Sequence, residues 1–184
     1  ATLASRHVEL CKLMLKTLSQ VAIASVSAGS EDDVQFMSTG TWKVLLCVLL
    51  GVADYLLQKP LQPYCYLSEE IGEQLLSIFI ELWLRSQIFS ATLWDSLRQL
   101  YPRWTHRMLA ISQWSAISLA LTQRVTKILY GQGTSSVVYT VYSNLVTLDL
   151  SDQYAVYAWY QVLHLIGSPN SLTPQIFFRS VLGM

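Results

Sequence analysis

The chain has 184 residues, of which 52% are apolar and only 13% are charged. The charged share is about half of that in an average soluble domain, so the chain should carry more apolar surface than an isolated domain buries. Lysine and arginine number 12, aspartate and glutamate also number 12, and the formal net charge is zero. Nucleic-acid-binding proteins carry a basic stripe for the phosphates, and this sequence has none. Three cysteines do not form a disulfide framework and favour a cytoplasmic protein.

The longest strongly apolar run covers residues 44–57 and is interrupted by Gly51 and Asp54. A membrane-spanning helix needs about 20 apolar residues, so this run predicts a buried helix rather than an integral membrane segment. Arg6 and Glu9 interrupt the start of the chain, which argues against a secretory signal.

The first predicted helix begins near residue 3, because apolar positions recur at steps of three and four. Its predicted core face consists of Leu3, His7, Leu10, Met14, Leu18 and Val21. We expect it to end near Gly29, which can adopt the left-handed C-cap conformation, and to be followed by an acidic loop over residues 30–40.

Thr41 is the predicted N-cap of a second helix over residues 42–59, since its hydroxyl can accept from the free amides of the next turn. This segment is apolar on nearly all sides, which predicts burial between neighbours on both flanks. Pro60 and Pro63 end it.

A third helix should begin at Ser68, with Glu69, Glu70 and Glu73 opposing the positive end of the helix dipole. Its predicted core stripe is Ile71, Leu75, Ile78, Phe79, Leu82 and Trp83. The spacing of Thr92 and Asp95 predicts a capping box for a short helix that Pro102 terminates.

The longest helix is predicted over residues 103–130, where apolar residues follow the helical period through seven turns and Gly131 then stops the helix. The stripe is Trp104, Met108, Ile111, Trp114, Ile117, Leu121, Val125 and Ile128.

Residues 134–150 have strand propensity but no evident partner strand, so they predict an extended connector packed against helices. Ser151 or Asp152 should cap a helix to about Ile166, and the proline of Thr173–Pro174 fits the first position of a last helix. Together these elements predict an all-α fold, an α-solenoid of the HEAT or armadillo kind with one extended connector. We expect residues 1–184 to form a single helical domain that is a fragment of a larger protein.

Candidate catalytic and metal-binding residues each have a simpler structural interpretation. His7 and Cys11 have the i, i+4 spacing of metal ligands, but Cys47 and Cys65 have no Cys or His beside them to complete a site. His164 lies among apolar residues and is expected to be structural. The three carboxylates at the start of the third helix are better explained as dipole partners than as acid–base catalysts.

Trp94, Trp104 and Trp114 lie at ten-residue intervals, which suggests a stacking platform for bases. Without interleaved basic residues they are better interpreted as core anchors. The sequence has no phosphate-binding glycine loop, nucleophile elbow or dinucleotide fingerprint. It therefore predicts no catalytic residue, no cofactor and no metal.

Several segments, in shared order, resemble the RalGAP (Ral GTPase-activating protein) subunits. They are TWKVLLCVLL at 41–50, DYLL at 54–57, GEQLL at 72–76, FIELWL at 79–84, QW at 113–114 and ALTQR at 120–124. Trp159, LH at 163–164 and PQIFFR at 174–179 are most similar to the β subunit. Residues 130–159 depart from the family pattern, and the join at residues 169–174 is shorter than expected. The chain resembles tuberin more distantly.

This resemblance implies a non-catalytic regulatory segment that supports GTP hydrolysis by Ral-type small GTPases through a complex with a catalytic α subunit. The related catalytic domain uses an asparagine on a helix, whereas the two asparagines here, Asn144 and Asn170, lie in no convincing helix. One alternative is an enzyme that supplies an arginine finger from Arg85, Arg98 or Arg107. Another is an α-solenoid adaptor unrelated to GTPases. The sequence does not identify the partner-binding surface.

Overall fold

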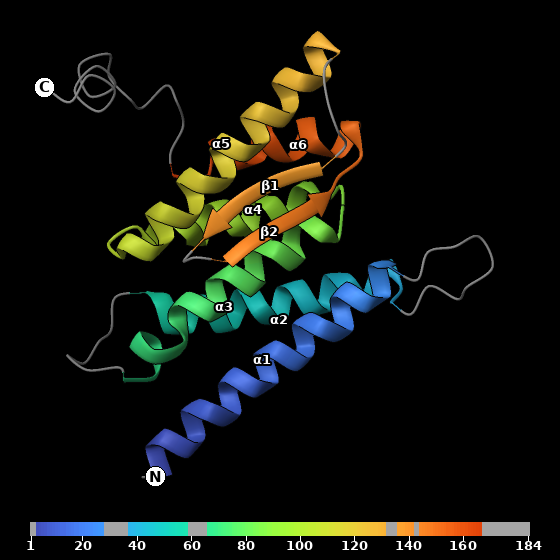
Figure 1. The fold of residues 1–184 in the computed structure, drawn as a ribbon. Helices are drawn as coiled ribbons and strands as arrows, with labels where there is room; N and C mark the ends of the chain where they lie inside the picture. The colour runs from blue at the N-terminus through green and yellow to red at the C-terminus, as the bar shows by residue number, and fades with distance from the viewer. Residues whose placement is uncertain (1–2, 28–36, 59–65, 132–135, 142–143, 167–184) are drawn as a thin grey trace, which may run out of the picture.

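Six α-helices, one 3₁₀ turn and a β-hairpin make up the part of the chain that the computed structural model describes, residues 3–27, 37–58, 66–131, 136–141 and 144–166 (Figure 1). The elements in chain order are α1 (Leu3–Ser27), α2 (Thr39–Leu57), α3 (Tyr66–Arg85), α4 (Ala91–Leu100), η1 (Tyr101–Trp104), α5 (Met108–Tyr130), β1 (Ser136–Val141), β2 (Asn144–Asp149) and α6 (Asp152–Leu163). The all-α prediction is confirmed, with the hairpin as an addition.

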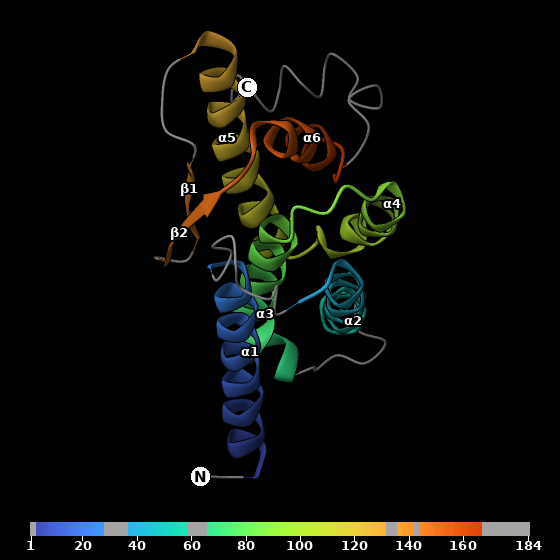
Figure 2. The same cartoon turned by 90° about the vertical axis from the view of Figure 1, so that its right-hand side faces the viewer.

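The third helix, α3, occupies the centre of the fold. The first two helices both pack against it, and Figure 2 shows α3 between them. It also contacts α5 and β2, while α6 packs against α5. A helix with neighbours on several sides must be apolar on several faces, and ten residues of α3 are buried. The predicted stripe of α3 is confirmed except at Ile78, which is half-buried.

The core around α3 is dominated by aromatic rings. Trp83 packs edge-on against Phe79 and Trp94, with ring centroids 5.3 Å and 5.5 Å apart. Trp104 lies beside Tyr101 at 5.2 Å and is fully buried. Such edge-to-face pairs are favoured by the ring quadrupoles. Trp94 and Trp104 are therefore core anchors, as predicted, and their rings are not available as a stacking platform.

The prediction of an extended connector over residues 134–150 is wrong, because residues 136–141 and 144–149 pair with one another as two strands. β1 and β2 form an antiparallel hairpin in which Tyr139 lies opposite Val146 and Val137 opposite Leu148. These four side chains are buried, with β1 against α5 and β2 against α3. An isolated two-stranded hairpin is marginal in water, so this one depends on the helices that cover one of its faces.

The helix starts differ from the sequence prediction at several positions. The N-cap of α2 is Ser38 rather than Thr41, and its Oγ accepts a hydrogen bond from the Thr41 amide at 3.1 Å. α3 begins two residues before Ser68, which is buried and donates to the Leu56 carbonyl at 2.6 Å. A serine hydroxyl can cap a helix or satisfy another element's carbonyl, and the sequence does not distinguish the two roles.

The fourth and fifth helices also begin away from their predicted starts. Asp95 forms an ion pair with Arg98 instead of completing a capping box with Thr92. α5 begins at Met108 because the 3₁₀ turn intervenes, and it ends as predicted at Gly131, whose φ is +67°. Ser151 is the N-cap of α6, as predicted. The predictions for Gly29, Pro60, Pro63 and the helix from Thr173 lie outside the described residues.

Candidate protein-interaction surface

The first helix buries a different face from the one predicted. Its stripe toward α3 has the same helical spacing but is displaced around the helix, and it consists of Val8, Cys11, Leu15, Ser19 and Ala22, all buried or half-buried. The predicted stripe lies on the solvent side, where Met14 is 64% exposed and Leu10 is 55% exposed. The physical reason is that both faces of α1 are largely apolar, and the small side chains of Ser19 and Ala22 allow α1 to approach α3 closely.

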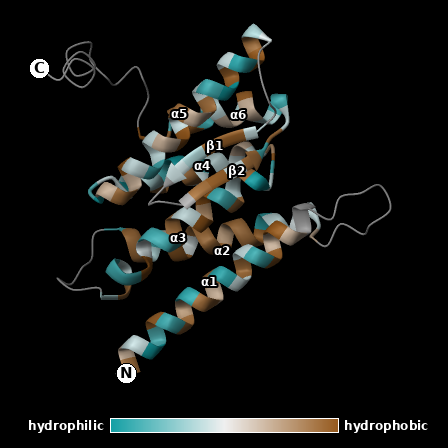
Figure 3. Ribbon diagram, viewed as in Figure 1, coloured by the Kyte–Doolittle hydropathy of each residue, from teal (hydrophilic) through white to brown (hydrophobic). Residues whose placement is uncertain are grey.

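The second helix is covered on one flank only, contrary to the prediction of burial on both. Its buried flank consists of Trp42, Leu46, Leu49, Leu50, Ala53, Leu56 and Leu57. On the open flank Val44 is 65% exposed and Val48 is 58% exposed, and Val52 and Tyr55 extend the same flank. Figure 3 shows the apolar colouring along α2. Exposed apolar residues grouped along one helix mark an interaction surface more often than residues scattered singly.

An apolar groove joins the open sides of these two helices. It has a volume of about 410 Å³ and is lined by Leu18, Val21, Ala22, Met37, Thr41, Val44, Leu45 and Val48. Thr41 is the one polar residue in this set. We call the groove together with the exposed residues Leu10, Met14, Val52 and Tyr55 the α1–α2 apolar surface. It is suited to burying the apolar face of another helix.

Among the described helices, α2 alone is long and apolar enough to cross a membrane by length and composition. A core helix of a soluble protein passes the same test. Asp54 in its last turns accepts hydrogen bonds from Arg103 at 2.9 Å and from the Trp104 indole at 3.1 Å. A carboxylate held in this way and seven buried residues place one flank of α2 in the core of this fold.

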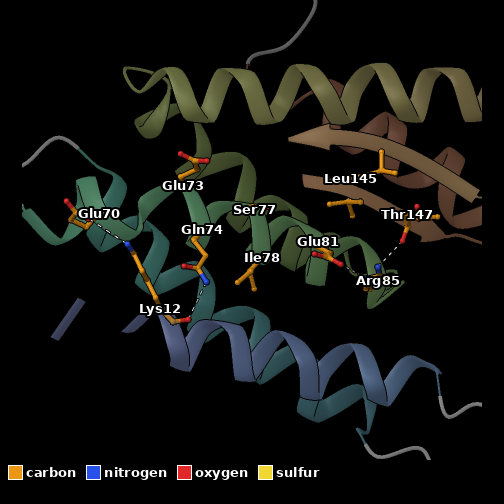
Figure 4. A pocket seen from close by; sticks show the side chains of 11 residues that line it. Lys12, Glu70, Glu73, Gln74, Ser77, Ile78, Glu81, Arg85, Leu145 and Thr147 are labelled. Atoms are coloured by element: carbon orange, nitrogen blue, oxygen red, sulfur yellow. Dashed lines mark hydrogen bonds and ion pairs between the residues drawn. The ribbon is translucent and has the colours of Figure 1, made fainter. Parts of the chain in front are cut away.

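A second, polar groove lies on the other side of α1. It has a volume of about 560 Å³ and is bounded by α1, α3 and β2 (Figure 4). Lys12 of α1 forms an ion pair with Glu70 of α3 at 3.7 Å, and the Gln74 amide donates to the Lys12 carbonyl at 3.3 Å. Arg85 bonds Glu81 at 2.9 Å and the Thr147 carbonyl at 2.8 Å. These contacts tie α1 and β2 to α3 at the two ends of the groove.

Each candidate arginine finger is engaged within the chain. Arg85 makes the two contacts just described, and Arg98 bonds Asp95 and Gln161. The Arg107 side chain, 11% exposed, donates to the Leu57 carbonyl at 2.9 Å and to Glu69 at 3.1 Å. A guanidinium at the carboxyl end of α2 opposes the negative end of the helix dipole. An arginine finger must instead reach a partner's phosphates, so these contacts favour structural roles.

The other candidate residues are not brought together into a site. Among the described residues, no three His, Cys, Asp or Glu side chains are grouped so that they could hold a metal ion. His7 is exposed, whereas Cys11 is half-buried and packs against the core. The carboxylates Glu69 and Glu70 pair with Arg107 and Lys12, respectively.

The remaining predicted residues have varied environments. Trp114, predicted to be a buried anchor, is half-buried, and its indole donates to the Val162 carbonyl at 2.8 Å, which joins α5 to α6. His164 follows α6, and its Nδ1 lies 2.6 Å from the Tyr160 carbonyl oxygen. Asn144 is the first residue of β2, and Asn170 and Cys65 lie outside the described residues.

Curated proteins similar to the chain include a Rap-GAP domain-containing protein of Dictyostelium discoideum, 27% identical over 97% of the chain. The Ral GTPase-activating protein subunit beta of rat is 26% identical and that of human 25% identical, each over 92% of the chain. The chain spans 11% of the length of each of these relatives. No solved structure matches.

A family model described as the RALGAPB N-terminal domain matches residues 3–132, which include α1 to α5 and therefore the α1–α2 apolar surface. The hairpin and α6 follow the matched segment. Because the match covers more than half of the chain, this protein belongs to the RALGAPB N-terminal domain family.

Proposed function

We propose that this chain is a non-catalytic scaffold segment of a RalGAP β-like regulatory subunit. In this proposal it supports activation of GTP hydrolysis by Ral-type small GTPases through a complex with a catalytic α subunit, and it acts in the cytoplasm. Family membership supports the assignment to a β-like subunit, and the names of the mammalian relatives supply the GTPase.

The observation that carries the scaffold role is the α1–α2 apolar surface. Val44, Val48 and Met14 are each more than half exposed, although the core beside them is filled. Interface cores are rich in such apolar side chains and poor in charge. We propose that this surface packs against apolar helices of the assembled complex, either by solenoid stacking within the subunit or against the α subunit.

The test is co-purification of the tagged chain with a RalGAP α subunit, comparing the parent with Met14→Glu and Val48→Glu. Both substitutions place a charge on the apolar surface without touching the α3 core, so we expect at least a tenfold loss of bound α subunit. Gln99→Glu adds the same charge at an exposed position on α4 and should bind like the parent. Equal binding by all four proteins would show that the α1–α2 apolar surface does not contact the α subunit.

The non-catalytic part of the proposal has a separate test. Single-turnover GTP hydrolysis by Ral should be the same with and without the purified chain, because Arg85, Arg98 and Arg107 are engaged in intramolecular contacts. A tenfold acceleration that disappears in Arg85→Ala or Arg107→Ala, with the variant still folded by circular dichroism, would establish an arginine finger and overturn this proposal.

A further inference from the structure

The outer edge of β2 borders the polar groove and carries backbone groups that β1 does not use. The Thr147 carbonyl accepts from Arg85 at 2.8 Å, and the Asp149 carbonyl accepts from the Gln87 amide at 3.2 Å. Both acceptors lie on odd-numbered residues, so these residues direct their backbone groups away from β1. Alternate residues of an antiparallel strand face the same neighbour, and Leu145 therefore also directs its N–H and C=O outward.

The side chains of Arg85 and Gln87 protect only the later part of this edge. They occupy the carbonyls of Thr147 and Asp149, which is how natural proteins limit pairing at an exposed strand edge. The earlier part has no such cover among the described residues, and Leu145 is 71% exposed. The open backbone groups are the N–H and C=O of Leu145 and the N–H of Thr147.

The groove beside this edge has room for an extended segment. Its volume of about 560 Å³ lies in the range of small-ligand and peptide sites. α3 forms the floor through Ser77 and Ile78, with α1 opposite β2 (Figure 4). A segment in this space would lie alongside β2 and have one face toward α3.

The charges that line the groove favour a basic occupant. Three carboxylates, those of Glu70, Glu73 and Glu81, face two cations. Glu70 and Glu81 are paired with Lys12 and Arg85, respectively, which leaves Glu73 without an ion pair among the described residues.

The Tyr139 side chain of β1 is buried and lies within electrostatic range of the Glu81–Arg85 ion pair. Burial is the main cause of its raised pKa, and the Glu81 carboxylate raises that pKa further against the opposing effect of Arg85. Its hydroxyl has no hydrogen-bond partner among the described residues.

We propose that this groove binds an extended, lysine- or arginine-containing peptide segment of a partner protein, which adds as a third strand to the β2 edge at Leu145 and places a basic side chain near Glu73. Main-chain hydrogen bonds give affinity in this mode of recognition, and the flanking side chains give specificity. The site is separate from the α1–α2 apolar surface and does not depend on the GTPase assignment.

The test uses the full chain and a fluorescent, end-blocked five-residue peptide that alternates lysine with valine, with binding followed by fluorescence anisotropy. Leu145→Pro removes the outward N–H that the proposal requires, and proline is tolerated at an edge where the N–H faces solvent. Thr140→Pro is the matched control, because Thr140 lies opposite Leu145 on β1 and its N–H faces the other edge of the hairpin. We expect binding to weaken at least tenfold in Leu145→Pro and to be unchanged in Thr140→Pro.

Two further comparisons do not depend on proline. Glu73→Gln leaves the strand intact and should weaken binding about two- to fivefold, as expected for an exposed ion pair. The same peptide with glutamate in place of lysine should not bind. Equal binding of the acidic peptide, or equal loss in the two proline variants that keep the parent's circular dichroism spectrum, would overturn the proposal. A parent chain that sediments as a dimer, and becomes monomeric only in Leu145→Pro, would instead assign this edge to a second copy.

Discussion

The α1–α2 layer and the half of the molecule built by α3, α4, η1 and α6 use similar residues in different ways. Around α3, the large side chains Trp83, Trp94 and Tyr154 are buried almost completely. On α1 and α2, Met14, Val44 and Val48 remain more than half exposed. The first layer is covered on one side only, by α3 and, for α2, also by η1 and α4, whereas α3 itself has neighbours on several sides.

This difference indicates that the residues that stabilise the fold are not those that are exposed for recognition. An apolar residue contributes to folding only in proportion to the apolar area that it removes from water. The aromatic cluster around α3 should therefore supply much of the folding free energy. The outward side chains of α1 and α2 should contribute little until a partner covers them.

The strongest test of this division is Trp104→Ala. The ring is fully buried, contacts Phe79 and Tyr101, and donates to Asp54. We expect a loss of ~3–5 kcal/mol in the free energy of unfolding, measured by urea denaturation. Trp159→Ala is the matched control, because Trp159 is half-buried and its indole bonds the exposed Thr122 hydroxyl. If Trp159→Ala cost as much as Trp104→Ala, the core would not be centred on α3.

A smaller effect is expected at the junction of α5 and α6. Trp114→Phe keeps an aromatic ring but removes the hydrogen bond to the Val162 carbonyl. Losing one partner of such a bond costs about 1–2 kcal/mol, which should appear as a lower midpoint with an unchanged denaturant slope. A variant that keeps the parent's midpoint but loses a binding partner would place Trp114 in an interface instead.

The smallest effect on stability is expected on the α1–α2 apolar surface. Val48→Glu should change the free energy of unfolding by less than about 0.5 kcal/mol, because Val48 is 58% exposed. The same substitution should reduce self-association of the parent chain, measured by light scattering over a concentration series. Binding of a hydrophobic dye should fall in parallel.

The behaviour of the parent chain could contradict this last prediction. If it is a monodisperse monomer at high concentration and binds no hydrophobic dye, the exposed valines do not drive association. The α1–α2 layer and the region around α3 would then differ in how far their apolar side chains are buried, but not in their tendency to associate.

The sequence by itself determined which of the described segments are helical, together with the end of α5 and the N-cap of α6. The long apolar period before Gly131 predicted the course of α5 from Met108 onward, and the left-handed conformation of that glycine ended it where expected. The all-α class followed from such local signals, because helix hydrogen bonds and caps connect residues only a few positions apart. The family resemblance likewise depended on the order of short segments and needed no contacts.

The tertiary structure alone decided which apolar face found a neighbour. Periodicity predicted that the apolar stripe of α1 around Met14 is buried, but the stripe that includes Val8 and Ala22 is buried instead. The sequence also did not predict the pairing of Tyr139 with Val146 or the contact of Arg107 with the end of α2. These contacts join residues that are distant or ambiguous in the sequence, and they form only when the packing of α3 brings their partners within reach. The candidate surfaces consist of what that packing left uncovered.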